Sequence, residues 1–314
     1  MVFFKKQKIW ILILILLVLP LNTKATVLYF KPSSSELKSG ETFILKIELF
    51  TQKECINAVK INLKFPRDLL IVKDFSDGNS ILTLWPERPS IDQGKGQISF
   101  TGGIPKGYCE DKGLLGKIIF QAKEVSRKIE GRIKFLDDSL VLLNDGFGSK
   151  AKLEKKDFTF SLLPERVEAS KDVWQEILEK DKNPPEEFKL EVRKDSLLFG
   201  EKYVLIFNTT DKESGISHFE VAEQKMKFCV PTEKEKWERA KSPYLIKDQS
   251  LKSIIKVKAV DKAGNKRVIT FNPCEKYYPL FMIFAIVIGG TGIIFWSFFK
   301  IKKRKKLQNY ERKN

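Results

Sequence analysis

Residues 26–163 consist of short apolar runs separated by turn residues, and this pattern constrains the fold more than any other feature of the chain. In 45–49 and in 59–65, apolar residues alternate with charged or polar ones, as in a strand with one buried face. Glycine, proline and Asn-Asp-Gly interrupt the runs, which is typical of turns. Because helical periodicity is missing, we predict that this segment forms an all-β, jelly-roll-like, nine-stranded β-sandwich. The expected strands lie at 27–30, 42–49, 58–65, 69–75, 97–101, 114–122, 132–135, 139–143 and 158–163.

A second, smaller strand-rich segment covers residues 188–272 and has the size of a minimal immunoglobulin-like (Ig-like) β-sandwich. Between the two segments, residues 164–187 contain one or two helical turns at 173–178, followed by Asn183-Pro184-Pro185, a stiff sequence typical of linkers. We therefore predict a β-sandwich at 26–163, a linker at 164–187 and an Ig-like stalk domain at 188–272. The stalk strands are expected at 188–193, 203–208, 216–223, 254–261 and 266–271.

Two apolar runs flank these domains. Residues 9–21 follow three lysines and precede Thr23-Lys24-Ala25, so residues 1–25 have the pattern of a secretory signal peptide. Residues 277–299 carry no charge over 23 residues, enough for one transmembrane helix across about 30 Å of hydrocarbon. The basic run at 300–306 assigns 300–314 to the cytoplasm. We expect a single-pass protein of the cell membrane whose N-terminus lies outside after signal cleavage.

The net charge of +17 first suggests a nucleic-acid partner, but its distribution argues against one. Residues 300–314 contribute +7 and residues 1–24 contribute +4, which leaves +6 for the rest of the chain. Most of the excess is therefore a topology signal that also attracts anionic lipid headgroups. We expect no nucleic-acid partner.

The four cysteines, Cys55, Cys109, Cys229 and Cys274, all lie in the exported part. Their spacing is too wide for a Cys-x-x-Cys metal site, and an even number in an oxidising compartment indicates disulfides. Three pairings are open. Pairing within each domain, Cys55 with Cys109 and Cys229 with Cys274, is the simplest, with free buried thiols as the alternative.

Residues 56–66, 69–72, 96–103, 115–122 and 139–146 follow one another in an order that resembles bacterial cohesin domains, which share a superfamily with carbohydrate-binding modules. The resemblance implies a non-catalytic module that binds a dockerin-type protein or a sugar, with a link to polysaccharide catabolism. Residues 211–221 and 257–265 resemble bacterial Ig-like or fibronectin type III repeats. Such repeats act as spacers on surface proteins.

A sugar site needs exposed aromatic rings beside polar groups. Trp85, directly before Pro86, is the best candidate, and Tyr108 and Phe147 lie in turn-rich stretches from which they would join it. The alternative is that Trp85 fills the core, as large aromatic side chains do.

A calcium site would use Asp137, Asp138, Asn144 and Asp145, four oxygen donors around one short strand. The alternative is a turn, because Asn-Asp-Gly forms turns for reasons of backbone geometry. For Asp211 and Asp261 in the stalk, the two alternatives are again a calcium site and a turn. No other cofactor is expected.

The function expected is that of a non-catalytic cell-surface protein that binds an extracellular glycan or a surface protein. His218 is the only histidine and belongs to a predicted stalk strand, so the first domain has no histidine base for a nucleophile. No catalytic residue is predicted. The alternative is a structural or adhesive envelope protein without a specific soluble ligand. An exposed Trp85 would favour sugar, and an apolar face on the strands at 58–65 and 114–122 would favour a protein.

Overall fold

The computed structural model describes residues 25–166, 172–195 and 199–275, with single residues between 291 and 302. The predicted signal peptide up to residue 24, most of the apolar run 277–299 and most of the tail 300–314 lie outside the described residues. Within the described part of the chain, no helix is both long and apolar enough to cross a membrane. The chain divides into two compact units, the first comprising residues 1–187, 208–217 and 259–267.

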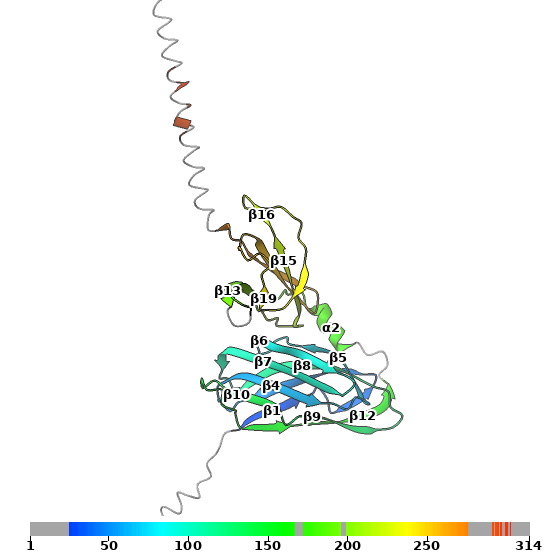
Figure 1. Ribbon diagram of the computed structural model, residues 1–314. Helices are drawn as coiled ribbons and strands as arrows, with labels where there is room; N and C mark the ends of the chain where they lie inside the picture. Colours follow the sequence, from blue (N-terminus) through cyan, green and yellow to red (C-terminus); the bar gives the residue numbers. More distant parts are fainter. Residues whose placement is uncertain are drawn as a thin grey trace, which may run out of the picture. The chain divides into compact units, whose positions relative to one another are not determined.

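The first unit contains a β-sandwich of two sheets, which confirms the predicted all-β fold (Figure 1). One sheet has the strand order β11-β1-β3-β8-β5 and the other β2-β12-β9-β4-β7-β6, with β10 beside β4. The strands are β1 (Thr26–Lys31), β2 (Glu36–Ser39), β3 (Thr42–Phe50), β4 (Ile56–Lys64), β5 (Leu70–Ser76), β6 (Leu84–Asp92), β7 (Gln97–Tyr108), β8 (Lys112–Ala122), β9 (Ile129–Phe135), β10 (Leu140–Leu143), β11 (Leu153–Lys156) and β12 (Phe158–Arg166).

The core of this sandwich consists of the alternate residues that the sequence pattern assigns to one face. In β3 and β4 every second residue is apolar and buried, as at Leu45 and Ile61, while the intervening residues, such as Lys46 and Lys60, are exposed or half-buried. Phe120 is central to the core and packs against Phe43 and Phe65, with ring centroids 5.6 and 5.5 Å away. The two inner faces therefore interlock through aromatic and aliphatic side chains, as in other sandwiches.

Each of the nine predicted strands is present, and three further strands were not predicted. Two of these, β2 and β11, have four residues each and lie at sheet edges. The third, β6, contains Pro86 and Pro89 and is an edge strand, the position in a sheet that tolerates proline.

The second unit comprises residues 188–207, 218–258 and 268–314, and its described part is also built of strands. A three-stranded sheet has the order β13-β14-β19, a four-stranded sheet the order β18-β15-β20-β21, and β16 and β17 form a separate hairpin. The strands are β13 (Glu191–Asp195), β14 (Lys202–Ile206), β15 (Ile216–Gln224), β16 (Met226–Lys227), β17 (Val230–Pro231), β18 (Glu238–Ala240), β19 (Tyr244–Leu245), β20 (Ile254–Asp261) and β21 (Lys266–Phe271).

Both expected disulfides are present. Cys55 is bonded to Cys109 and Cys229 to Cys274, and no described cysteine is free. The pairing within each domain is thus confirmed over the other two pairings and over free thiols.

The predicted helical turns at 173–178 are part of α2 (Val173–Lys180). Asp172 caps this helix, since its side chain accepts a hydrogen bond from the Trp174 N–H at 2.9 Å. Trp174 is buried, and α2 packs against β3. Residues 172–187, expected as a linker, therefore hold a helix that belongs to the first unit.

Candidate functional site

The three aromatic residues predicted for a sugar site do not form one platform. Trp85 is half-buried and packs against the core rings of Phe75 and Phe100, with centroids 6.2 and 5.7 Å away. Tyr108 lies eight residues beyond Phe100 on β7, about 26 Å along an extended strand. Its hydroxyl donates to the Lys112 carbonyl, and burial raises its pKa. Trp85 therefore packs on the core, which was the alternative to a sugar-binding role.

Phe147, the third member, lies in the loop between β10 and β11 and is 91% exposed. The loop is held by Asp145, whose Oδ1 accepts from the backbone N–H groups of Phe147 at 2.9 Å and Gly148 at 3.1 Å. These bonds lower the pKa of Asp145, together with the side-chain hydrogen bond to Ser149, which has the largest effect. Asp145 thus acts as a turn former.

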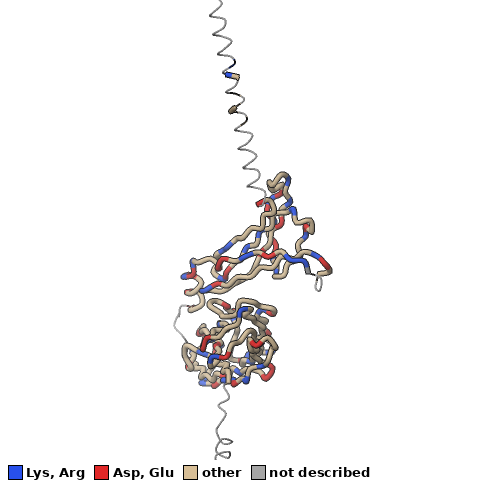
Figure 2. Tube along the Cα trace, turned by 90° about the vertical axis from the view of Figure 1, so that its left-hand side faces the viewer, with Lys and Arg blue, Asp and Glu red and all other residues tan. Residues whose placement is uncertain are grey.

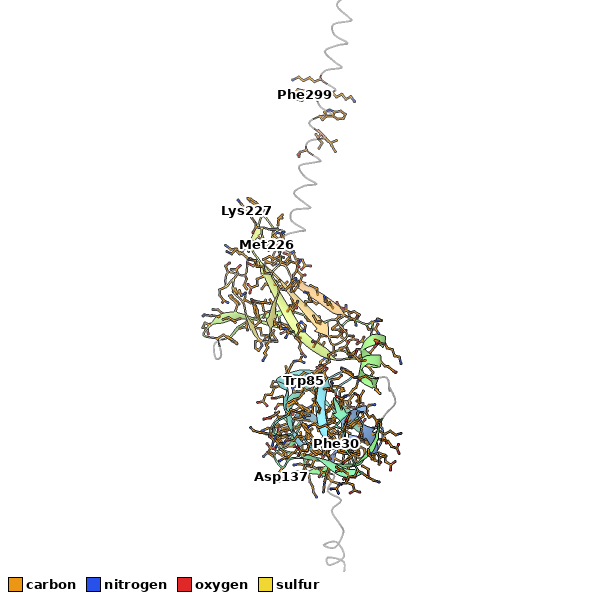
Figure 3. The ribbon with its side chains drawn as sticks, turned by 90° about the vertical axis from the view of Figure 1, so that its right-hand side faces the viewer. Phe30, Trp85, Asp137, Met226, Lys227 and Phe299 are labelled. Carbon is orange, nitrogen blue, oxygen red and sulfur yellow. A yellow bond between two sulfur atoms is a disulfide. The ribbon has the colours of Figure 1, made fainter. Side chains whose placement is uncertain are left out.

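The other residues predicted for calcium are also engaged separately. Asp138 accepts from Asn62 Nδ2 at 2.5 Å. Asp137 and Asp138 line a hollow of about 260 Å³ that Lys150 and Lys155 also line, and these lysines disfavour a cation. Figure 3 shows Asp137 and Trp85 on opposite sides of the sandwich.

Asn144, the fourth predicted ligand, lies beside β7. Its backbone N–H donates to the Cys55 carbonyl at 2.8 Å, and its side chain occupies the space in which a Cβ at Gly107 would lie. The four residues predicted to bind calcium therefore make separate contacts in turns and strands.

A hollow on the outer face of the five-stranded sheet is a stronger candidate for a binding site. The register lines up side chains from β11, β1, β3 and β8 in two adjacent rows. The alternate residues, including Leu28 and Leu49, are buried in the core, so both rows face outward. The first row is Glu154, Val27, Phe50 and Lys112, and the second row is Lys156, Tyr29, Glu48 and Leu114.

The hollow has a volume of about 480 Å³. Val27 is buried and forms its floor, with the half-buried rings of Tyr29 and Phe50 beside it. Its other lining residues are Phe30, Lys112, Lys156 and Asp157. We call this site the sheet groove.

Charge around the sheet groove is arranged asymmetrically. The Tyr29 hydroxyl donates to Glu48 at 2.8 Å, and Lys31 lies 3.6 Å from the same carboxylate. Burial and the hydrogen bond to Glu48 raise the pKa of Tyr29 to about 12, so its ring stays neutral. Asp157 is paired with Arg132 at 2.8 Å. The acids are thus matched by partners, which leaves an apolar floor with a basic rim.

Elsewhere on the sandwich, exposed apolar side chains lie on other elements: Ile71 on β5, Leu84 and Ile91 on the edge strand β6, and Phe147 in the loop between β10 and β11. The outer side of β4 carries Lys60, Asn62 and Lys64, so this strand does not present the apolar face that would have favoured a protein partner there. On the five-stranded sheet, Ile44 pairs with Ile119 on the outer face, yet Ile119 is fully buried. That end of the face is covered, and the sheet groove is its open end.

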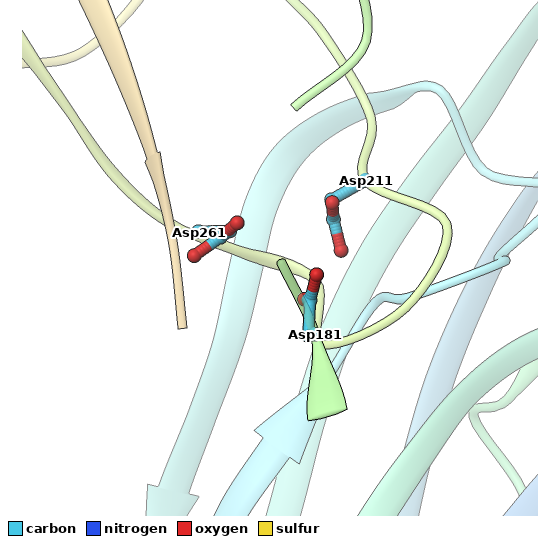
Figure 4. A group of neighbouring side chains, drawn as sticks. All are labelled: Asp181, Asp211 and Asp261. Carbon is cyan, nitrogen blue, oxygen red and sulfur yellow. The ribbon is translucent and has the colours of Figure 1, made fainter. Parts of the chain in front are cut away.

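A separate cluster of three aspartates lies in the first unit (Figure 4). Asp181 follows α2, Asp211 lies in the segment 208–217 and Asp261 ends β20. All three are buried, and one carboxylate oxygen of each lies within 4.8 Å of the others. Asp211 Oδ1 accepts from the backbone N–H of Gly215 at 2.7 Å, and Asp261 Oδ1 from that of Asn265 at 2.8 Å. Within the described residues, none of the three forms a salt bridge.

Burial raises the pKa of both Asp211 and Asp261, and the negative charge of Asp181 raises them further. Carboxylate oxygens are the ligands that Ca²⁺ takes in proteins. The cluster therefore offers the carboxylate oxygens that a calcium site needs. It includes Asp211 and Asp261, the two residues that the sequence analysis considered for such a site. Sequence reasoning missed Asp181, which only the fold brings to them.

His218 lies on β15, and its Nε2 is 3.3 Å from Glu220 Oε1. Lys258 Nζ donates to the same carboxylate at 2.6 Å. This is a surface network on a strand, as predicted for this residue.

The basic rim does not extend over the whole molecule. Figure 2 shows Lys and Arg interspersed with Asp and Glu along the traces of both units.

Comparisons with known proteins find similar folds but no relative in sequence. No family model matches the chain, and no curated protein matches it. Part of the chain is similar to the seventh ScaB type I cohesin from Pseudobacteroides cellulosolvens, at 15% identity over 46% of this chain and 95% of that one, with a TM-score of 0.37. A non-cellulosomal cohesin from Archaeoglobus fulgidus is similar at 15% identity over 45% and 92%, with a TM-score of 0.36. A type II cohesin from Acetivibrio cellulolyticus is similar at 12% identity over 44% and 95%, with a TM-score of 0.34. All three of these structures are cohesin domains.

Proposed function

We propose that this chain is a non-catalytic protein-binding module held at the cell membrane, and that the sheet groove is its docking site. The observation that carries the proposal is the hollow in which Val27, Tyr29 and Phe50 lie side by side on the outer face of the five-stranded sheet. Aromatic side chains are enriched where proteins bind one another.

The lining of the groove defines the chemistry of the partner. Lys112 and Lys156 extend from opposite sides, on β8 and β11, and both are exposed. Lys156 also lies 3.5 Å from Glu154, an exposed pair that water screens. An acidic segment with an aromatic or aliphatic side chain would place the apolar group on Val27 and its carboxylates on the lysines. The resemblance to cohesin domains implies the same class of function, a protein-binding module.

The proposal favours protein over sugar. Trp85, on which the sugar interpretation rested, packs against Phe75 and Phe100. A glycan partner then lacks the stacking surface that was expected from Trp85. The structural or adhesive alternative requires no exposed patch at all, whereas the groove supplies one.

Membrane attachment is the second part of the proposal. It rests on the uncharged run 277–299 and the basic run 300–306 that follows it, with the signal-peptide pattern at 1–25 directing export. The two units would then face the exterior, and the groove would be accessible to a partner there.

The test is retention of a partner from the cell exterior by the full chain in detergent. We expect one protein to be retained by the wild type and at least tenfold less by Phe50→Asp, because a carboxylate beside the groove floor is desolvated on binding. Ile71→Asp is the matched control, since Ile71 is 36% exposed on β5 of the same sheet.

Three results would count against the proposal. Equal loss with Ile71→Asp would mean that the effect is not local to the groove. Binding of a glycan array that is unchanged by Phe50→Asp would favour the sugar alternative. Retention of no partner by the wild type would favour the structural one.

A further inference from the structure

The hairpin formed by β16 and β17 presents apolar side chains to solvent at its tip. Lys227 pairs with Val230, so Phe228 and Cys229 form a two-residue turn. Phe228 is 90% exposed and Val230 is 62% exposed. Such side chains together at a loop tip mark a contact surface.

The backbone of the turn makes this choice of residues unusual. Phe228 has φ = 52° and Cys229 has φ = 63°. Two-residue hairpin turns with positive φ at both positions favour Asn and Gly, and a bulky residue there costs free energy. A residue retained against this preference points to a function of its side chain. For Cys229 that function is the disulfide, and for Phe228 the fold offers no packing role.

The disulfide fixes where this tip lies within the second unit. Cys229 is bonded to Cys274, with Cα atoms 5.8 Å apart. Tyr277, the first residue of the apolar run, is three residues further along the chain, so its Cα is at most about 11 Å from that of Cys274. Figure 1 shows β16 at the end of the unit where the described chain reaches Glu275, and Figure 3 labels Met226 and Lys227 there.

We propose that the tip of this hairpin inserts into the interface of the lipid bilayer, beside the point where the chain enters it. The inference rests on the membrane attachment proposed above. The Cα of Cys229 lies at most about 17 Å from that of Tyr277 by these two spans. The headgroup layer on each side of a bilayer is about 5–8 Å thick, and the Phe228 ring is within reach of it when the tip is turned toward the bilayer.

The residues around the tip fit a lipid surface. Lys225 and Lys227 are both exposed, and Lys227 Nζ lies 6.0 Å from the centre of the Phe228 ring. An aromatic ring flanked by lysines matches a bilayer interface, in which the ring meets the acyl boundary and the lysines meet anionic headgroups. The hairpin then gives the second unit a second attachment point, and with it a fixed orientation on the membrane.

The experiment uses the full chain in vesicles of phosphatidylcholine and phosphatidylglycerol that contain a lipid-dissolved carbene precursor. After illumination and digestion, mass spectrometry maps the labelled peptides. We expect label in 277–299 and in 226–231, and at least tenfold less in the loop with Phe147, which is equally exposed at 91%. Phe228→Ser should reduce label in 226–231 at least fivefold and leave label in 277–299 unchanged, while Phe147→Ser should change neither.

Each failure has a distinct meaning. Label in 277–299 without label in 226–231 would overturn the hairpin inference and leave the membrane attachment standing. Absence of label from both would refute the attachment and the hairpin inference together. Equal labelling of the Phe147 loop would also overturn the inference, because exposure alone would then account for the signal.

Discussion

The ion pair between the buried Asp77 and the partly exposed Arg88 gives a prediction that the structure makes quantitative. Asp77 precedes β6, Arg88 belongs to it, and the Nη1–Oδ2 distance is 3.3 Å. Asp77 Oδ1 also accepts from the backbone N–H of Ile216 at 2.7 Å. Burial raises the pKa of Asp77, while Arg88, the Ile216 N–H and Lys262 lower it. Arg88→Met removes the positive charge that lowers the pKa of Asp77 most, and it nearly preserves side-chain volume.

The size of the effect depends on pH. Removing one partner of a fully buried pair costs about 3–5 kcal/mol. The Arg88 side chain is 38% exposed, so solvent screening reduces the expected loss in unfolding free energy to about 1–3 kcal/mol at pH 7. Because the folded-state pKa of Asp77 is raised above 3.8, stability falls as pH rises from 3.8 through that pKa. Below 3.8 the carboxyl is protonated in both states, and the loss from Arg88→Met should be small.

The assay is urea unfolding of the full chain in non-ionic detergent at a series of pH values, followed by circular dichroism. The control is Arg88→Met in an Asp77→Asn background, where no buried charge remains and we expect a loss below about 0.5 kcal/mol. A loss that is equal at pH 3 and pH 7, or equal in both backgrounds, would refute the reasoning, since packing alone would then explain it.

Three further predictions concern stability. Phe120→Ala should cost about 3–5 kcal/mol in urea unfolding and Phe147→Ala less than about 0.5 kcal/mol, because only the first ring is buried; similar losses would contradict the assigned core. Replacing Cys55 and Cys109 by serine should cost about 4 kcal/mol, as their separation of 54 residues implies, and an unchanged transition would argue against the crosslink. Asp211→Asn should raise stability at pH 7 in EDTA but not below pH 3.8, because the raised pKa of Asp211 opposes its ionisation; a loss at pH 7 would contradict this.

Much of the fold was predictable because strands with one buried face show it in their alternation. The pattern in 59–65 gives the buried and outward sides of β4. It could not give β6, whose two prolines lower strand propensity and whose edge position removes the need for regular pairing. Trp85 was ambiguous for a related reason, because the contact with Phe100 depends on how β6 pairs with β7.

The candidate sites depended on register, which a single sequence does not contain. Phe50 continues the alternation of Leu45, Ile47 and Leu49 and so falls on the outward side of its strand, whereas residues 27–30 are all apolar and their sequence does not tell the two sides apart. Only the pairing of Val27 with Phe50 shows that the rings share one patch. Asp181 joins Asp211 and Asp261 in the same way, through folding of three separate segments.

The central claim is that the sheet groove binds a protein, and a photoreactive residue in it tests this most directly. Benzoylphenylalanine at position 50 of the full chain on intact cells should give one discrete protein adduct on illumination. The same residue at position 71, on the same sheet but outside the groove, should give at least tenfold less. Equal adducts from both positions, or none from position 50, would contradict the account.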